Sequence, residues 1–210
     1  MKTFEELKEE LLNRAKNANA CQNGYKMGLD AKNKADLLKA ITANWFWVLI
    51  DARIVDAIYL EENFTEEELS EAGIYTRKCH EVRAVSFACG SATVKACDSA
   101  TVEACDSATV KACGSATVKA CGSATVKACD SATVRAYGSA TVEACDSATV
   151  RACDSATVRA YGSATVKACD ESYVEDCTGN IRPRYDYAIV KDYHNHKIYI
   201  RKGKFEIIEV

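Results

Sequence analysis

The sequence predicts an α+β protein in which a helical N-terminal domain caps a parallel β-solenoid and a β-rich segment closes the far end. Three observations support this prediction. Residues 1–80 place apolar side chains at helical spacing, residues 81–178 repeat one eight-residue phrase, and residues 179–210 carry large apolar side chains in strand-like runs. We therefore expect three parts: a helical domain, an octapeptide-repeat solenoid, and a C-terminal cap or dimerisation segment.

The helical domain is expected to begin with a capped helix. Thr3 followed by Glu6 forms a capping box, and apolar residues at positions 4, 7, 11, 12 and 15 recur at helical spacing. The polar residues 22–24 predict a break after this helix. Beyond the break, an apolar stripe predicts one long helix from about Lys34 to Leu60.

The other elements outside the repeat are expected to be short. A second capping box, Thr65 with Glu68, predicts a helix that Gly73 is placed to end. In the C-terminal segment, strands are expected at 187–193, 197–202 and 204–210, with a turn at 194–196. These strands would cover the last coil of the solenoid, which otherwise exposes unpaired backbone groups.

The solenoid prediction depends on the octad, of which ten nearly perfect copies run from Ser91 to Asp170, with a degenerate copy at each end (RAVSFACG and ESYVEDCT). In a strand, the small apolar residues at positions two, four and six share one face. Thr, a charged residue and Cys, at positions three, five and seven, share the other. Because a buried unpaired charge is costly, the small apolar set must face inward. Asp or Gly at position eight, usually followed by Ser, predicts a corner.

The number of octads in one coil is left open by the sequence. Two octads would form a flattened roll of 16 residues per coil, and three would form a triangular coil of 24. We favour the two-sided roll, because small inward residues fill a thin interior and would leave voids in a triangle. The triangular alternative has one supporting pattern, the 24-residue spacing shared by four glycines and two tyrosines: Gly90, Gly114, Gly138, Gly162, Tyr137 and Tyr161.

The octads, together with a segment from Ala20 through Gly24 and Leu37 to Trp47, resemble uncharacterised bacterial and phage-associated octapeptide-repeat proteins. In those proteins "SATV" phrases form long arrays after a helical segment. The resemblance covers most of the chain before residue 179, and this sequence departs from it by using Cys where Tyr or Trp is common. The family has no known activity, so the resemblance implies no functional residues. Its association with phages implies an inhibitor of a host defence system.

Composition and motifs exclude several classes of function. The net charge of −3 does not indicate binding of a polyanion by bulk charge, and the acidic N-terminus does not resemble a signal peptide. The longest apolar run, at 45–50, is too short to span a membrane, so we expect a cytoplasmic protein with no membrane partner. No phosphate-binding loop, nucleophile elbow or Cys-x-x-Cys pair occurs, so we expect no enzyme activity, no metal and no cofactor.

The twelve cysteines are interpreted as reduced packing residues. Nine of them recur at position seven of the octads between Ser91 and Thr178, where two copies hold Tyr137 and Tyr161 instead. If these cysteines formed disulfides, replacing one of them by tyrosine would leave the other cysteine of the pair unpaired. On a two-sided roll these cysteines would stack in rows, one row along each corner.

The candidate interaction residues are aromatic and basic. Successive helical residues point about 100° apart, so one of Trp45, Phe46 and Trp47 should be exposed or packed on the first coil. On a two-sided roll, basic residues at position five stack in a row on each sheet, with about 4.8 Å between successive residues of a row. Such a row could bind an anionic partner, which makes Lys119, Arg135 and Arg151 candidate interaction residues. The set is completed by four tyrosines: Tyr137, Tyr161, Tyr187 and Tyr193.

The expected function is that of a non-enzymatic, rigid interaction or inhibitor protein, whose partner is another protein and whose solenoid is a scaffold. One alternative is a self-assembling structural protein that forms dimers or filaments through the coil ends, including a homo-oligomer through the C-terminal segment. The other is nucleic-acid binding along the basic rows. Nucleic acid is disfavoured, because six aspartates at position eight bring the ten octads to zero net charge and no aromatic platform is interleaved.

Overall fold

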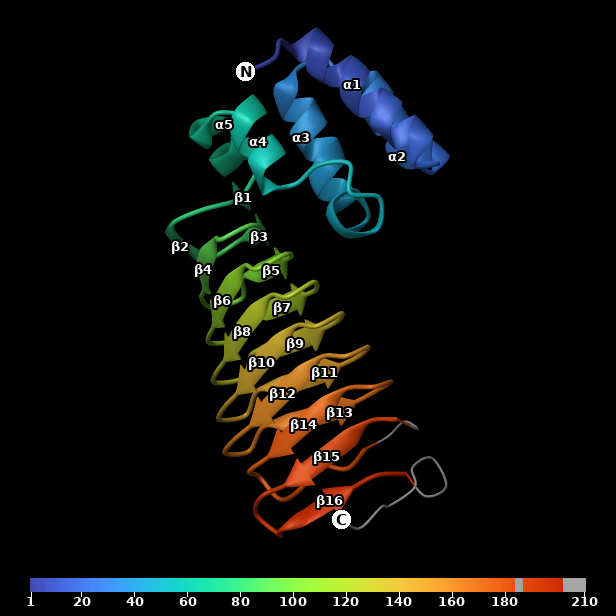
Figure 1. The fold of residues 1–210 in the computed structure, drawn as a ribbon. Helices are drawn as coiled ribbons and strands as arrows, with labels where there is room; N and C mark the ends of the chain where they lie inside the picture. Colours follow the sequence, from blue (N-terminus) through green and yellow to red (C-terminus); the bar gives the residue numbers. More distant parts are fainter. Residues whose placement is uncertain (184–186, 202–210) are drawn as a thin grey trace.

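The computed structural model describes residues 1–183 and 187–201, and it places a helical domain on one end of a long roll of β-strands (Figure 1). Successive octads alternate between two parallel sheets. Each coil therefore takes 16 residues, as the pairing of Thr125 with Thr141 shows. The predicted α+β class and the two-sided coil are confirmed, and the triangular alternative is wrong.

The strands form two sheets with one interior between them. Sheet A contains, in spatial order, β1 (Ile74–Tyr75), β3 (Val85–Ala88), β5 (Thr101–Ala104), β7 (Thr117–Ala120), β9 (Thr133–Ala136), β11 (Thr149–Ala152) and β13 (Thr165–Ala168). Sheet B contains β2 (Cys79–Val82), β4 (Thr93–Ala96), β6 (Thr109–Ala112), β8 (Thr125–Ala128), β10 (Thr141–Ala144), β12 (Thr157–Ala160), β14 (Tyr173–Asp176), β15 (Ile189–Asp192) and β16 (Lys197–Tyr199). Octad neighbours pair in parallel with Thr opposite Thr and Val opposite Val.

The interior of the roll is built from positions two, four and six of the octads. The valines at position four are fully buried, as at Val126 and Val142, whereas the adjacent Thr125 is exposed. Val and Ala from both sheets form one continuous apolar cluster along the roll. The predicted inward set is thus confirmed, and its removal from water is the main stabilising contribution to the roll.

The corners require a residue that tolerates positive φ, which explains why position eight holds only Asp or Gly in the ten regular octads. Asp130 has a φ of 56° and Gly122 a φ of 65°. The aspartates also link successive coils: the backbone N–H of Gly114 donates to Oδ2 of Asp130 at 2.9 Å. The Asp130 N–H donates in turn to Oδ2 of Asp146 at 3.2 Å. Both residue types permit the turn, and Asp adds a hydrogen bond that Gly lacks.

The helical domain consists of α1 (Phe4–Asn17), α2 (Gln22–Asp30), α3 (Lys34–Ala43), the π-helical turn η1 (Trp47–Asp51), α4 (Ala57–Asn63) and α5 (Glu66–Glu71). Both predicted capping boxes are confirmed, at the starts of α1 and α5. The predicted break at 22–24 is wrong, because α2 begins there. Cys21 caps this helix, with its Sγ accepting a hydrogen bond from the N–H of Gly24 at 3.4 Å.

The predicted long helix over 34–60 is also wrong. After α3 the chain forms the wide turn η1, and Arg53 then adopts a left-handed φ of 48° before α4 begins. The reason lies in the uninterrupted apolar run at 45–50, which has no polar side to turn toward solvent. The turn and the chain reversal bury Val48 and Leu49 in the helical core, where a straight helix would leave part of the run exposed.

The C-terminal segment continues the roll before closing it. β15 pairs in parallel with β14, 16 residues earlier, and Ala188 and Val190 are fully buried in the interior. The phrase YAIVKDYH, residues 187–194, is therefore a further octad. β16 then pairs antiparallel with β15 after the predicted turn at 194–196, and it ends at Tyr199. The strand predicted at 204–210 lies outside the described residues.

The buried interior predicts that Val126→Ala will destabilise the roll by about 2 kcal/mol, since two methyl groups leave a site that cannot collapse. Thr125→Ala, on the adjacent exposed position, should change the free energy of unfolding by less than about 0.5 kcal/mol. Urea denaturation of both variants measures the difference. Equal effects would contradict the inward assignment.

The corner geometry predicts that Asp130→Ala will be less stable than Asp130→Gly by about 1 kcal/mol, because alanine disfavours the left-handed region that glycine enters freely. Both variants lose the hydrogen bond from Gly114, so that loss cancels in the comparison. Thermal unfolding followed by circular dichroism provides the measurement. A Gly variant no more stable than the Ala variant would refute the strain argument.

Candidate interaction face

The helical domain is joined to the roll through an aromatic contact. In the first degenerate octad, RAVSFACG, position five holds Phe87 where the regular copies hold a charged residue. Trp45 packs on Phe87 with ring centroids 5.1 Å apart, and Trp45 is only 2% exposed. One aromatic of the run therefore packs on the first coil, as expected. Trp45 belongs to the joint between the domains and is not available as a docking residue.

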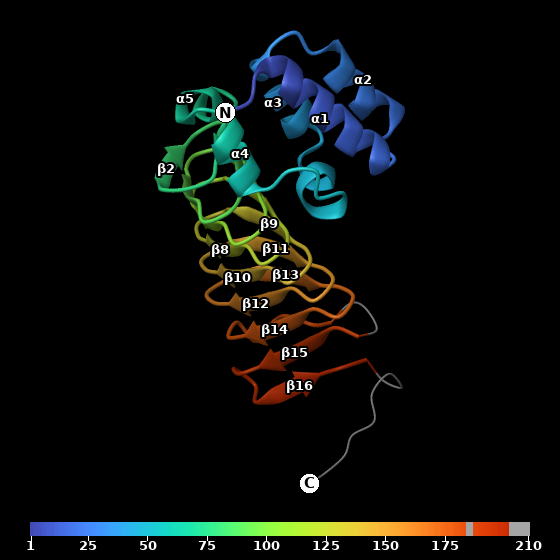
Figure 2. The ribbon, with the colours of Figure 1, turned by 45° about the horizontal axis from the view of Figure 1, so that its top comes forward.

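Residues at the edge of η1 extend the contact along the outer face of sheet A. The ring of Phe46 lies under the ammonium of Lys119, with Nζ 3.7 Å from the ring centroid. The thiols of Cys105 and Cys121, at the adjoining corner, belong to the same apolar cluster as the helical core. The helical domain thus covers the first coils of sheet A and leaves the later coils uncovered (Figure 2).

The part of the helical domain around η1 that covers the first coils of sheet A is called the helical overhang. A cleft of about 610 Å³ lies where this overhang meets the roll. Phe46 and Ile50 line it from the helical domain, and Tyr137 and Lys119 line it from sheet A and its corner. Exposed carboxylates line it as well, from Asp51 and Asp154. The cleft therefore combines apolar and aromatic surface with a few charged groups, a combination typical of binding sites.

A row of cations leads away from this cleft along sheet A. Position five of four successive strands holds Lys119, Arg135, Arg151 and Lys167, which are direct neighbours in the parallel register. Neighbouring strands are about 4.8 Å apart, so the like charges are closely spaced. Among the ion pairs of the described residues, none involves Lys119, Arg135 or Arg151. We call these four residues the basic row.

Most of the equivalent row on sheet B is neutralised by its own acids; among the ion pairs of the described residues, only Lys111 of the four cations in its regular octads is absent. Lys95 pairs with Glu81 at 3.3 Å, Lys127 with Glu143 at 3.1 Å, and Arg159 with Glu175 at 2.5 Å. Each pair joins position five of adjacent strands, so acid and base neutralise each other across the ladder. The two faces of the roll, built from the same octad, therefore differ in charge arrangement.

Glu103 precedes the basic row and lies next to the helical overhang. Burial raises the pKa of the Glu103 carboxyl, and the charge of Lys119 offsets only part of this rise. Glu103, at position five of β5, is thus an acid that is partly removed from water beside the helical domain. The first cation of the row that is clear of this cover is Arg135, which is exposed.

The structure brings some of the candidate residues together and separates others. Phe46, Lys119 and Tyr137 meet at the cleft, and Arg135 and Arg151 follow in the basic row. Trp47 is partly buried and lines a small apolar groove inside the helical domain. Three tyrosines lie elsewhere: Tyr161 at the opposite corner, and Tyr187 and Tyr193 near β15.

Sequence reasoning missed two cleft residues in particular, Ile50 and Asp51. Both were placed inside a long helix, where they would have had no relation to sheet A. The only signal that could have located them is Phe87, because an aromatic residue at an otherwise charged position marks a covered part of the face.

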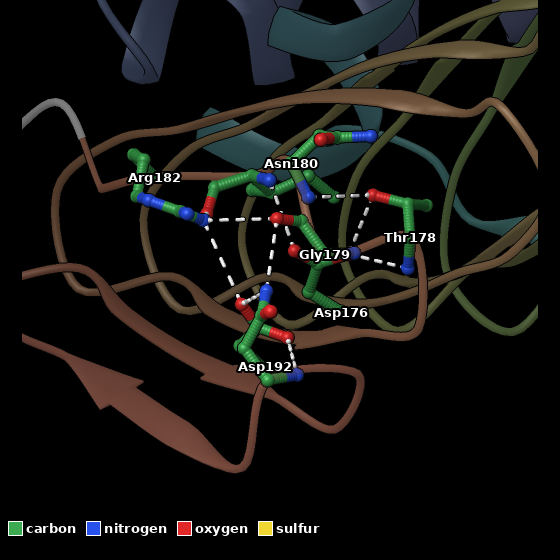
Figure 3. Close-up of polar contacts among 8 residues, drawn as sticks. Asp176, Thr178, Gly179, Asn180, Arg182 and Asp192 are labelled. Carbon is green, nitrogen blue, oxygen red and sulfur yellow. Dashed lines mark hydrogen bonds and ion pairs between the residues drawn. The ribbon is translucent and has the colours of Figure 1, made fainter.

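A second polar cluster lies at the C-terminal end of the roll (Figure 3). Asp176 and Asp192 occupy position six, the place of an inward alanine, and are 0% and 1% exposed. The carboxylate of Asp176 accepts hydrogen bonds from the N–H groups of Thr178, Gly179 and Ile181 at 2.7–3.1 Å. Backbone donors thus satisfy this carboxylate, and the arrangement shapes the corner that follows β14.

Asp192 is held in a similar way. Burial opposes its ionisation, but hydrogen bonds from Asn195 and the nearby Arg182 outweigh this effect and hold the pKa of Asp192 below its ordinary value. The side chain of Asn195 also donates to the carbonyl oxygen of Gly179 at 3.3 Å, which ties the two corners together. Both aspartates are therefore explained by the closure of the roll, without a ligand.

The raised pKa of Glu103 predicts a pH-dependent gain from Glu103→Gln. An acid whose pKa is higher in the folded state destabilises the fold once the unfolded chain ionises. The variant should therefore unfold at a slightly higher temperature at pH 7, and the gain should disappear as the pH falls below about 4.3, the ordinary glutamate pKa. Thermal unfolding at several pH values measures this. Glu143→Gln on sheet B is the control, expected to lose its ion pair with Lys127 and to show no gain.

Over 1–183 and 187–201, no three His, Cys, Asp or Glu side chains are grouped as metal ligands, and no helix has the length and apolar character needed to cross a membrane. No family model matches the chain, and no match occurs among curated proteins or solved structures. What the chain binds must therefore be inferred from its own surface.

Proposed function

We propose that this chain is a non-enzymatic binding protein that recognises an acidic segment on a partner protein through the cleft and the basic row. The single observation that carries this proposal is the difference between the two faces of the roll. Sheet A carries a run of four neighbouring cations, whereas three of the four cations in the regular octads of sheet B are paired with an acid on the adjacent strand. Stacked like charges destabilise each other, so an anionic partner that relieves their repulsion would bind favourably.

The shape of the face favours a protein partner over a nucleic acid. The basic row is one residue wide, and the corner beside it carries Asp154 and Asp170, whose carboxylates would repel a broad polyanion. The cleft at the end of the row has apolar and aromatic walls from Phe46, Ile50 and Tyr137, which suit a hydrophobic anchor side chain. An extended acidic segment with one apolar anchor matches both features.

The rigidity of the roll supports an inhibitory outcome of such binding. Every coil is linked to the next by backbone pairing and by Val and Ala packing, so the face is presented with little ordering cost. With the resemblance to phage-associated repeat proteins, we propose that the partner belongs to a host defence system and that the face covers its acidic working surface.

This function predicts that the charge reversals Arg135→Glu and Arg151→Glu, made together, will weaken binding to an acidic peptide. The probe is a fluorescently labelled poly-glutamate peptide, and binding is followed by anisotropy at low salt. We expect a loss of affinity of at least about tenfold, because like charges then face the peptide. The matched control, Lys111→Glu with Lys127→Glu, reverses two charges on sheet B and should keep the affinity.

Two outcomes would overturn the proposal. Equal loss in both double variants would show that only net charge matters. Tighter binding of single-stranded oligothymidylate of the same charge, with a steep salt dependence, would favour nucleic acid as the ligand.

If neither outcome occurs, the partner can be identified by capture from a bacterial lysate. The wild type should capture an acidic protein that the sheet A double variant does not capture.

A further inference from the structure

The cysteines at position seven form a row along each corner of the roll, and the structure brings neighbouring thiols into contact, among them two pairs in the first coils. Sγ of Cys97 lies 3.7 Å from Sγ of Cys113, and Sγ of Cys105 lies 3.5 Å from Sγ of Cys121. All four are free thiols. Parallel neighbours in register have Cα atoms about 4.8 Å apart, which lies inside the range that a disulfide spans.

The two pairs differ in their access to solvent. Cys105 and Cys121 are buried in the apolar cluster beneath the helical overhang. Cys113 is half-buried at the opposite corner, which the overhang does not cover, and Cys97 beside it is 8% exposed. Thiol–disulfide exchange requires that the attacking sulfur reach the oxidant, so of these two pairs only the one that contains the half-buried Cys113 can react in the folded protein.

We propose that Cys97 and Cys113 are an oxidative modification site, in which a low-molecular-weight disulfide such as oxidised glutathione links two successive coils of sheet B. The thiolate of Cys113 attacks one sulfur of oxidised glutathione, forming a mixed disulfide and releasing one glutathione. Cys97 then attacks the Cys113 sulfur and releases the second glutathione. The two protein thiols together lose two electrons and two protons. The two released glutathione molecules take up these electrons and protons as their thiols.

The surroundings make this reaction slow at neutral pH. Burial and the neighbouring Cys113 thiol raise the pKa of Cys97, so few molecules carry the Cys97 thiolate that completes the second exchange. The charged side chains that act on the pair are the acidic Glu81 and the basic Lys95 and Arg83. The rate should therefore rise with pH. The disulfide would form slowly and would cross-link the first coils of the roll, whereas a redox-sensor cysteine reacts fast.

The test incubates the full chain with oxidised glutathione at pH 8, blocks the remaining thiols by alkylation and maps the linked peptides by mass spectrometry. Trypsin is unsuitable, because residues 112–119 and 120–127 are identical and Cys97 shares a peptide with Cys105. Cleavage before aspartate separates Cys97 from Cys105 at Asp98, and fragmentation of the 106–129 peptide, which contains Cys113, Cys121 and Cys129, identifies the linked cysteine. We expect the Cys97–Cys113 link to form first, and the Cys105–Cys121 link to form only in urea.

Three variants make the result decisive. Cys97→Ser should accumulate one glutathione on Cys113, because no second thiol completes the exchange. Cys113→Ser should remove the link, and Cys121→Ser, the matched change in the covered pair, should leave it unchanged. Linkage of Cys113 to Cys129 in place of Cys97, equally fast linkage of the covered pair in the folded protein, or alkylation of both Cys97 and Cys113 after prolonged exposure would each overturn the proposal.

Discussion

The thin, dry interior between the two sheets is the constraint on which the rest of the structure depends. Val and Ala at positions two, four and six fill it completely, so the sheets can lie close only where the inward side chains stay small. This requirement leaves positions three, five and seven outside and puts the turn at position eight. The charged rows, the corner aspartates and the stacked thiols are all consequences of that one packing choice.

Most of the roll could be predicted because each octad combines small apolar, charged and turn-forming residues in an order that only one strand-and-corner arrangement satisfies. A charge at position five in every regular copy forces the small residues inward, and the Asp or Gly at position eight requires a left-handed corner. The continuation through residues 187–194 was harder to see. There Asp192 replaces an inward alanine, and only the surrounding backbone donors and Arg182 make that replacement acceptable.

The helical domain and the cleft were less predictable, because their geometry comes from tertiary contacts. Apolar spacing from residue 34 to residue 60 is equally consistent with one helix or with two helices that fold back on each other. What decides is the contact of Trp45 with Phe87 and of Phe46 with Lys119, which exist only once the domain rests on the roll. Of the candidate residues, those on the roll could be placed by register alone, whereas those in the aromatic run could not.

The alternation of octads between the sheets has a consequence for how such a chain can change length. Loss or gain of two octads removes or adds one whole coil and leaves every later residue on its original side. Loss or gain of a single octad ahead of residue 135 would transfer all later residues to the opposite sheet, so Arg135 and Arg151 would lie on the other face of the roll relative to the helical domain. Parity of repeat number is thus a structural property of this architecture, and viable length variants should differ by even numbers of octads.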